Sequence, residues 1–265
     1  MEKFDSSKHL KYAQRLPFAY YSHPSYLDFA AYIFVRNGEH IIVSQDIYYL
    51  HEFPAIFMPQ NKLNWENLSV TFATQEDLEK VEEQGIEIKI QKPVEKEFFY
   101  STKLFIEQKE SFLQRVNQFK RLYDYKILNN YPRNKIIKFY EKWKSQKART
   151  GDTFEENEKF FFFCLDNLKK YSIRQVYVEV NSKLAGFAWG ALHNKDNWIG
   201  LHLKADYQFK GLSRFMHHHR AKLFVGTEKF SLGTGAREGG ISQYKEELGP
   251  ILEKEYSYLY TGGKK

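Results

Sequence analysis

Hydrophobic and polar positions alternate along several short runs in the first part of the chain. Two β-rich runs, at residues 30–36 and 39–43, flank Asn37-Gly38, a dipeptide that favours the tight turn of a β-hairpin. A charged run at residues 75–84 has helical period and stops at Gly85. Further strands are predicted at residues 47–50, 86–90 and 98–102, and a segment containing proline and asparagine is found at 53–67.

The rest of the chain switches between helical and strand periods more regularly. Residues 107–121 have helical period, with Phe112, Val116 and Phe119 on one face. The predicted elements that follow are a strand at 125–128, helices at 132–147 and 154–170, strands at 174–180, 184–192 and 198–204, a helix at 210–224, a strand at 230–232, a helix at 239–248 and a strand at 256–260. This order predicts a mixed α/β (α+β) fold, with mixed central sheets flanked by helices.

Basic residues are concentrated in the middle of the chain. Residues 103–149 contain 13 lysines and arginines against 4 aspartates and glutamates, whereas the whole chain has a formal net charge of +7. Lys135, Lys138, Lys142 and Arg149 recur at helical spacings, so they share one exposed side. Such a surface favours a polyanionic partner, either RNA such as tRNA or an anionic lipid surface. An ordinary solvated helix face is the alternative interpretation.

The composition limits the class of protein. Apolar residues make up 42% of the 265 residues, as in globular chains, and the longest apolar run, 160–165, is far shorter than a membrane span. The N-terminus lacks the basic start and apolar core of a secretory signal. The single cysteine, Cys164, excludes an internal disulfide and fits a reducing compartment. We therefore expect a cytoplasmic protein, and peripheral attachment to a membrane stays open.

One predicted helix opens on the pattern Gln208-x-x-Gly211-x-Ser213, after the strand at 198–204. The first N–H groups of a helix have no intrahelical acceptor, the helix dipole adds partial positive charge there, and small residues leave these groups accessible. The segment therefore predicts a site for the phosphate of a donor molecule, formed by Gln208, Lys210, Gly211 and Ser213. The alternative is that Gly211 serves only the turn that begins the helix.

The order of elements between residues 125 and 260 resembles that of the GNAT acyltransferase fold. In that fold a Gln/Arg-x-x-Gly-x-Gly/Ala pattern binds the donor pyrophosphate at the start of the helix after the fourth strand, and Gln208, Gly211 and Ser213 occupy this position. Ser213 departs from the glycine or alanine of the pattern. The resemblance implies transfer of an activated acyl group to an amine or a hydroxyl.

The run from Ser231 to Lys245 resembles the strand, loop and helix of the C-terminal domain of bacterial phosphatidylglycerol lysyltransferases. The chain is also distantly similar to the Fem-type aminoacyl-tRNA-dependent transferases. Gly240, Ile241 and Lys245 match the family's Gly-Leu-Arg-x-x-Lys run. The resemblance implies that Arg237, Gly240 and Lys245 bind the donor.

The same family has two GNAT-like halves. By resemblance, residues 1–102 form a degenerate N-terminal half without a phosphate-loop pattern, and residues 103–265 form a complete C-terminal half that begins with a basic helix.

The transfer needs a route for the acceptor's proton and hydrogen-bond donors for the developing oxyanion. Glu179 and His202, on two predicted strands, are candidate bases, and Tyr244 is a candidate proton donor. Trp198, Gly200, His202 and Lys204 share one face of their predicted strand, which favours a cleft there. For each of these side chains a structural role is the alternative.

Metal binding is not predicted from the histidines of this sequence. His217, His218 and His219 are consecutive, and consecutive side chains on a regular helix point about 100° apart, so these three cannot share one ion.

These patterns predict an acyl or aminoacyl transferase without a permanently bound cofactor. The donor is acyl-CoA or aminoacyl-tRNA, and the acceptor is a small molecule or a lipid. Two alternatives stay open: a coenzyme A-dependent N-acetyltransferase of a small amine, and a non-catalytic module that binds RNA or an anionic membrane.

Overall fold

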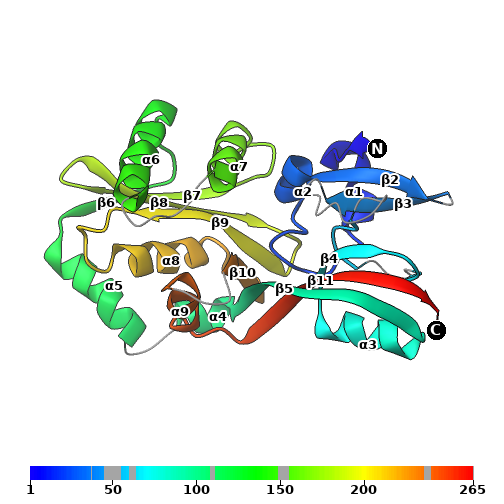
Figure 1. Ribbon diagram of the computed structural model, residues 1–265. Coiled ribbons are helices and arrows are strands. Elements are labelled where there is room, and N and C mark those ends of the chain that lie inside the picture. Colours follow the sequence, from blue (N-terminus) through cyan, green and yellow to red (C-terminus); the bar gives the residue numbers. More distant parts are fainter. Residues whose placement is uncertain are drawn as a thin grey trace. The chain divides into compact units, whose positions relative to one another are not determined.

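The chain forms two compact units (Figure 1). The computed structural model describes residues 1–36, 38–44, 55–59, 64–107, 111–148, 155–235 and 240–264. Unit 1 comprises Met1–Phe99 and Gly233–Lys265, and unit 2 comprises Tyr100–Leu232. The units therefore divide the chain at two points, within strands β5 (Ile86–Ser101) and β10 (Lys229–Gly235), whereas the sequence predicts a single division after residue 102.

Unit 1 contains two groups of antiparallel strands. Strand β2 pairs with β1 and β3, and β11 lies between β4 and β5. The elements of this unit, besides β5, are β1 (Glu2–Lys3), α1 (Ser6–Ala13), α2 (Pro24–Ala30), β2 (Ala31–Arg36), β3 (Glu39–Ser44), β4 (Ser69–Ala73), α3 (Gln75–Glu83), α9 (Gly240–Glu246) and β11 (Leu252–Lys264). Two clusters of buried side chains form the core, one including Leu27 and Tyr256 and the other Val70 and Leu259.

Several local predictions for unit 1 are confirmed. Strands β2 and β3 form the expected hairpin, with Gly38 in the turn at a φ of 80°, whereas Asn37 and the strand predicted at 47–50 lie outside the described residues. Helix α3 begins with a capping box between Thr74 and Asp77 and is followed by Gly85 at a φ of 68°. The sequence patterns did not predict α1, α2 or β4.

The two strands predicted at 86–90 and 98–102 are one long strand. This correction concerns β5, which continues through residues 91–97, Pro93 included. Its register against β11 shifts between the pairs Lys96–Glu255 and Pro93–Ser257, so the proline sits beside a β-bulge. A bulge leaves backbone groups outside the ladder, and proline, which has no N–H to donate, is tolerated there.

Unit 2 is built on five strands in the order β10-β9-β8-β7-β6. Strands β9 and β10 are parallel, and the other neighbouring pairs are antiparallel. Besides β10, its elements are α4 (Thr102–Ile106), α5 (Ser111–Leu122), β6 (Tyr125–Leu128), α6 (Arg133–Ala148), α7 (Glu155–Asp166), β7 (Arg174–Val180), β8 (Lys183–Leu192), β9 (Asn197–Ala205) and α8 (Leu212–Lys222). The predicted order of elements and the mixed α/β class are confirmed.

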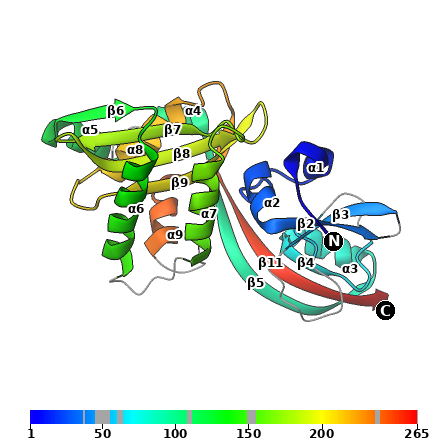
Figure 2. The ribbon, with the colours of Figure 1, turned by 90° about the horizontal axis from the view of Figure 1, so that it is seen from above.

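Helices cover both faces of the unit 2 strands (Figures 1 and 2). Helices α6 and α7 lie on one face, and α8 lies on the other, with α5 packed against α8. Gly186 and Gly190 permit the close approach of α8 and of Phe224, two residues beyond its end, because a Cβ at these positions would meet Met216 and Phe224 at 2.8 and 3.0 Å. Within the described ranges, no helix is long and apolar enough to span a membrane.

Candidate functional site

The predicted donor turn leads from β9 into α8, as the sequence pattern indicates. Gly211 is the residue that caps α8, and its backbone is left-handed with a φ of 84°. A Cβ at this position would lie 2.2 Å from the carbonyl oxygen of Arg115 in α5. The turn therefore requires glycine for two reasons, the backbone angle and the approach of a neighbouring helix.

Asp206 holds the first half of this turn. Its carboxylate accepts hydrogen bonds from the backbone N–H of Gln208 at 3.2 Å and from the Gln208 side-chain amide at 3.0 Å. It also accepts from Lys142 Nζ at 2.7 Å, and only 4% of Asp206 is exposed. The structure thus brings Gln208 and Lys142 together, although the sequence assigns them to different sites. An aspartate two residues before a turn residue is a recognisable Asx-turn signal, which points to Asp206 in retrospect.

Tyr123, just after α5, holds the second half of the turn. Its hydroxyl accepts a hydrogen bond from the Lys210 backbone N–H at 3.3 Å and donates one to the Gln208 carbonyl at 3.5 Å. Lys210 is exposed, Ser213 is half-buried in the first turn of α8, and the Arg214 guanidinium lies over the Phe112 ring. Helices α5 and α8 contain no acidic residue, so cations predominate on both.

Of the basic face predicted on α6, Lys142 has an acidic partner, and two other cations of this helix are also paired. Besides the Lys142–Asp206 pair, α6 forms ion pairs of 2.7 Å between Arg133 and Asp166 and of 2.6 Å between Lys144 and Glu158. The Lys135 ammonium lies over the ring of Tyr131, 5.8 Å from its centroid. Lys138 is exposed, and Arg149 lies outside the described residues.

Glu179 lies on β7 and is half-buried. One of its carboxylate oxygens accepts a hydrogen bond of 2.8 Å from the hydroxyl of Tyr131, which precedes α6. Burial and this carboxylate together raise the pKa of Tyr131 to about 12, so the phenol stays protonated and acts as the hydrogen-bond donor at neutral pH. Glu179 is thus a carboxylate with an ordered proton-bearing neighbour, which is compatible with the predicted role as a base.

His202 lies in the core of unit 2, where it contacts Phe160, Phe161 and Trp189. It is 5% exposed, and its burial lowers the pKa of the imidazole well below the usual value, with Lys204 and Arg220 lowering it further. The catalytic role predicted for His202 stays a prediction, and this burial argues against it.

The face predicted for β9 is wrong. Trp189 pairs with His202 and Gly190 pairs with Gly200, so Leu201 is an extra residue in a β-bulge. A bulge reverses the alternation of side chains. Gly200 therefore faces Arg220 of α8, whereas His202 contacts phenylalanines of α7 and Lys204 lies over Trp143 of α6.

The donor residues predicted near the C-terminus lie in unit 1. Lys245 of α9 donates hydrogen bonds to the carbonyl oxygens of Gly233 and Thr234, at 2.9 and 2.6 Å. Tyr244 is half-buried on the same helix, and Gly240 is the first residue of α9. Arg237 lies outside the described residues. The ammonium of Lys245 thus fixes the end of β10, a role that the sequence pattern does not indicate.

A chain of hydrogen bonds continues from Thr234 into the interior of unit 1. The hydroxyl of Tyr21 lies 2.6 Å from Thr234 Oγ1 and donates to the Glu95 carboxylate at 2.5 Å. Burial raises the pKa of Tyr21 well above its usual value, and Glu95 adds to the shift, so the phenol stays protonated. Sequence patterns did not single out Tyr21 or Glu95, because both lie outside the recognisable motifs.

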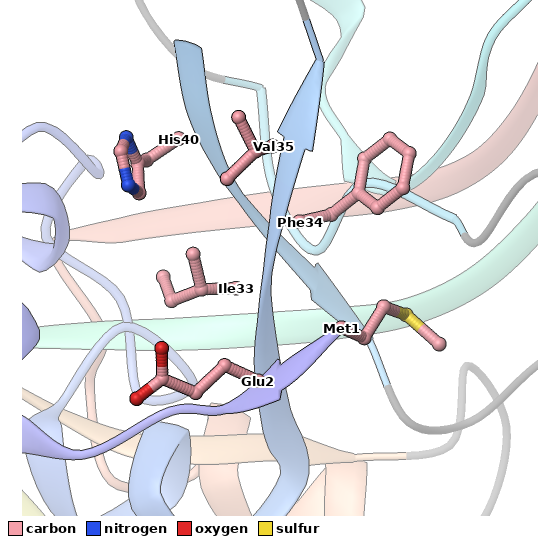
Figure 3. A pocket seen from close by; sticks show the side chains of 6 residues that line it. All are labelled: Met1, Glu2, Ile33, Phe34, Val35 and His40. Atoms are coloured by element: carbon pink, nitrogen blue, oxygen red, sulfur yellow. The ribbon is translucent and has the colours of Figure 1, made fainter. Parts of the chain in front are cut away.

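A hollow of about 370 Å³ lies at the edge of the small sheet of unit 1 (Figure 3). Side chains from the first residues, β2 and β3 line it, and they are Met1, Glu2, Ile33, Phe34, Val35 and His40. None of the predicted site residues belongs to it. Among the described residues, no three histidine, cysteine, aspartate or glutamate side chains are grouped closely enough to hold a metal ion.

Comparison with known proteins identifies solved structures that are similar to this one. The sequence matches no protein-family model, and no curated protein matches it. Its structure, however, is similar to that of a conserved protein of unknown function from Bacteroides thetaiotaomicron, with a TM-score of 0.78, 12% identity and 98% of each chain covered.

Two further similar structures are of named proteins. The C-terminal domain of a putative lysylphosphatidylglycerol synthetase from Agrobacterium fabrum has a TM-score of 0.60 and 10% identity over 96% of this chain and 92% of that one. FemX has a TM-score of 0.63 and 9% identity over 97% of this chain and 96% of that one. This chain has their fold. The resemblance indicated by the short motifs is thereby confirmed at the level of the fold, over nearly the whole chain.

Proposed function

We propose that this protein is an acyl or aminoacyl transferase. The acceptor's nitrogen or oxygen attacks the carbonyl carbon of an activated acyl group, the ester or thioester bond breaks, and the tRNA hydroxyl or coenzyme A thiol leaves with the proton that the acceptor loses. The proposal rests on a fold shared with a putative lysylphosphatidylglycerol synthetase and FemX, and on the turn at Gly211.

The observation that carries the proposal is the chemistry around this turn. Helix α8 follows β9 through the turn of residues 206–211, its N-terminus carries partial positive charge, and Lys210 and Arg115 are exposed beside it. Because α5 and α8 contain no carboxylate, an anion approaching them meets no acidic side chain of either helix. A phosphate-bearing donor is the ligand class that fits this environment.

Acyl transfer also requires hydrogen-bond donors for the oxyanion, and the strands beside the turn are their proposed source. The parallel pairing of β9 and β10 covers Asn197–Lys229 to Ile199–Ser231, and β9 continues to Ala205 beyond it. Backbone N–H groups of these central strands are the proposed donors for the oxyanion that develops on the acyl group. Glu179, paired with Tyr131, is the proposed base.

A thermal-shift comparison tests the donor. Acetyl-CoA, coenzyme A, aminoacylated tRNA and uncharged tRNA are added separately, since a donor that binds only the native state raises the melting temperature. Donors that shift the temperature are then tested for transfer of labelled acyl group to amine and hydroxyl acceptors. Absence of transfer from every donor would refute the proposed activity.

Charge-reversed variants locate the donor site. Lys210→Glu and Arg115→Glu are expected to reduce the donor-induced shift, because they place a carboxylate beside the helix N-terminus. Lys195→Glu is the matched control, since Lys195 is an exposed cation of unit 2 away from this turn. An equal loss in all three variants would assign the effect to net charge and not to the site. Gly211→Glu is unsuitable here, because any Cβ at that position collides with the Arg115 carbonyl.

A non-catalytic polyanion-binding module is the second candidate. The exposed cations of α6, among them Lys135 and Lys138, favour it, since such a surface also attracts nucleic acid or anionic lipid. Binding to tRNA and to anionic vesicles should weaken steeply with salt and should weaken further in the Lys135→Glu/Lys138→Glu double variant. Binding without any acyl transfer, reduced by this double variant, would favour the module over the enzyme.

A further inference from the structure

Tyr207 is an exposed aromatic residue on the turn between β9 and α8. The chain contains 4 tryptophans, 19 tyrosines and 23 phenylalanines. Among those whose burial the structure describes, Tyr207 is the only exposed one, with 58% of its surface accessible to solvent. A single exposed apolar side chain is common on protein surfaces, so its position decides what it means. This ring belongs to the turn that precedes the proposed donor helix, one residue before Gln208.

The backbone on both sides of Tyr207 is fixed. The Asp206 N–H donates to the carbonyl oxygen of Ala185 on β8 at 2.8 Å, and the Asp206 carbonyl accepts from the Phe209 N–H at 3.2 Å. The ring of Phe209 packs edge-on against that of Tyr123, with the two centroids 5.2 Å apart. A planar side chain on a turn anchored in this way binds a second planar group without reordering of the backbone, which lowers the entropic cost of binding.

The charges around the turn suit a ligand that combines a nucleobase with phosphate. Lys210 is exposed, three residues after Tyr207. The carboxylate of Asp206 is balanced by the Lys142 ammonium at 2.7 Å, so it opposes an approaching anion less. Aromatic rings bind nucleobases by stacking, and cations beside them bind the phosphates of the same nucleotide. Tyr207 and Lys210 thus present the two kinds of group that bind a nucleotide.

We propose that Tyr207 is the stacking platform for the adenine of the donor. Coenzyme A contains an adenosine diphosphate, and the 3′ end of an aminoacyl-tRNA is an adenosine that carries the acyl group, so both donor classes offer the same base. The base lies on the exposed ring of Tyr207, and the phosphates reach toward Lys210 and the start of α8. The inference rests on the proposed function for the identity of the donor, and it adds the residue that recognises the donor's base.

Isothermal titration with ADP tests the platform against inorganic pyrophosphate, which lacks the base. Wild type should bind ADP more tightly than pyrophosphate. Tyr207→Ala should weaken ADP binding about tenfold, because one base stack is lost, and should leave pyrophosphate binding within about twofold of wild type. Tyr207→Phe keeps the ring and should bind ADP within about twofold of wild type. Val225→Ala, which shortens another exposed apolar side chain of unit 2, is the control and should match wild type.

Three results would overturn the assignment of the base to Tyr207. The first is ADP affinity that is absent from wild type or equal in wild type and Tyr207→Ala. The second is a Tyr207→Phe variant as weak as Tyr207→Ala, which would show that the aromatic ring is not what binds. The third is an equal loss of ADP and pyrophosphate affinity in Tyr207→Ala, which would assign the effect to a displaced turn.

Two further measurements distinguish the source of the adenosine. With acetyl-CoA as donor, Tyr207→Ala should raise KM about tenfold and change kcat little, because the base is bound equally before and during the chemical step. With tRNA as donor, a short RNA hairpin that ends in adenosine should compete better in wild type than the same hairpin with an abasic last nucleotide. Tyr207→Ala should abolish this preference.

The same variants separate this inference from the proposed function. If ADP binds through Tyr207 but no donor supports acyl transfer, the proposed function fails and an adenosine-binding site remains. If a donor supports transfer and Tyr207→Ala uses it as well as wild type does, the inference fails and the proposed function stands.

Discussion

At the scale of single residues, the structure explains why a position requires a particular residue, whereas the sequence shows only which residue is there. Gly211 and Gly226 are both glycines with positive φ, of 84° and 96°. A Cβ on Gly226 would have nothing within 4 Å, whereas one on Gly211 would collide with the Arg115 carbonyl. Backbone angle alone therefore explains Gly226, and helix packing adds a second constraint on Gly211.

This pair of glycines permits a direct measurement of the packing constraint. Gly226→Ala should lower the free energy of unfolding by about 1 kcal/mol, which is the cost of a left-handed alanine. Gly211→Ala should cost at least about 2 kcal/mol more, because α5 or the turn must move to remove the clash. Urea unfolding of both variants measures the difference. Equal losses would show that α5 does not press on Gly211.

The lowered pKa values of two histidines predict how the stability of the protein depends on pH. Burial, with Lys222 and His218 adding to the effect, lowers the pKa of His219 to about 4, and burial lowers the pKa of His202 well below its usual value. Above about pH 6.5 these rings are neutral in both folded and unfolded chains, so their contribution to stability is complete. As pH falls below that value, the unfolded chain binds protons that the folded chain does not, and stability decreases.

Each such histidine contributes a slope of at most about 1.4 kcal/mol per pH unit. Urea unfolding between about pH 7 and about pH 5 should therefore show falling stability, and His219→Gln should have a shallower slope than wild type. His40→Gln is a suitable comparison, because His40 is an exposed histidine. Identical slopes in wild type and His219→Gln would contradict the assignment.

At the scale of elements, hydrophobic periodicity and the residues typical of element ends are sufficient to place the strands of unit 2 and its helices other than α4. They fail where a strand departs from simple alternation. Nothing in the residues around Leu201 marks a bulge, so the face predicted for His202 is wrong. Similarly, the strands predicted at 86–90 and 98–102 are parts of one strand, β5, which pairs with β11 on both sides of Pro93. The position of the turn at Gly211 is predictable because it depends on the order of elements and on the glycine itself, but its supports Asp206 and Tyr123 depend on tertiary contacts.

Helix α6 shows how the same residue type serves different purposes along one face. Lys142 is 55% exposed at its side chain, yet it pairs with the buried carboxylate of Asp206. Lys142→Ala should therefore cost about 1 kcal/mol of stability, a value between those of exposed and buried ion pairs. Lys138→Ala should stay within about 0.5 kcal/mol of wild type, because Lys138 is exposed. Chemical denaturation of the two single variants separates these outcomes, and a destabilised Lys138→Ala with a stable Lys142→Ala would reverse the assignment.

At the scale of the whole molecule, the N-terminal and C-terminal segments of the chain belong to the same unit. Unit 1 is completed by residues 233–265, whose strand β11 lies between β4 and β5. Local patterns cannot reveal that residues 233–265 pack in unit 1, because strand pairing between residues separated by most of the chain leaves no periodic signal. For this reason the sequence predicts one division after residue 102, although the C-terminal segment packs in unit 1.

This topology makes fragments cut at the predicted division informative. A fragment of residues 1–102 lacks β11, so β4 and β5 have no strand between them and the apolar cluster around Leu259 is incomplete. It should show little cooperative unfolding in urea. Residues 1–99 joined through a flexible linker to residues 233–265 contain all the strands of unit 1 and should recover a cooperative transition. As a matched control, the same linked fragment with Leu259→Asp places a charge in the core and should lose that transition again. Cooperative unfolding of the 1–102 fragment alone would show that the C-terminal strand is dispensable for the fold of unit 1.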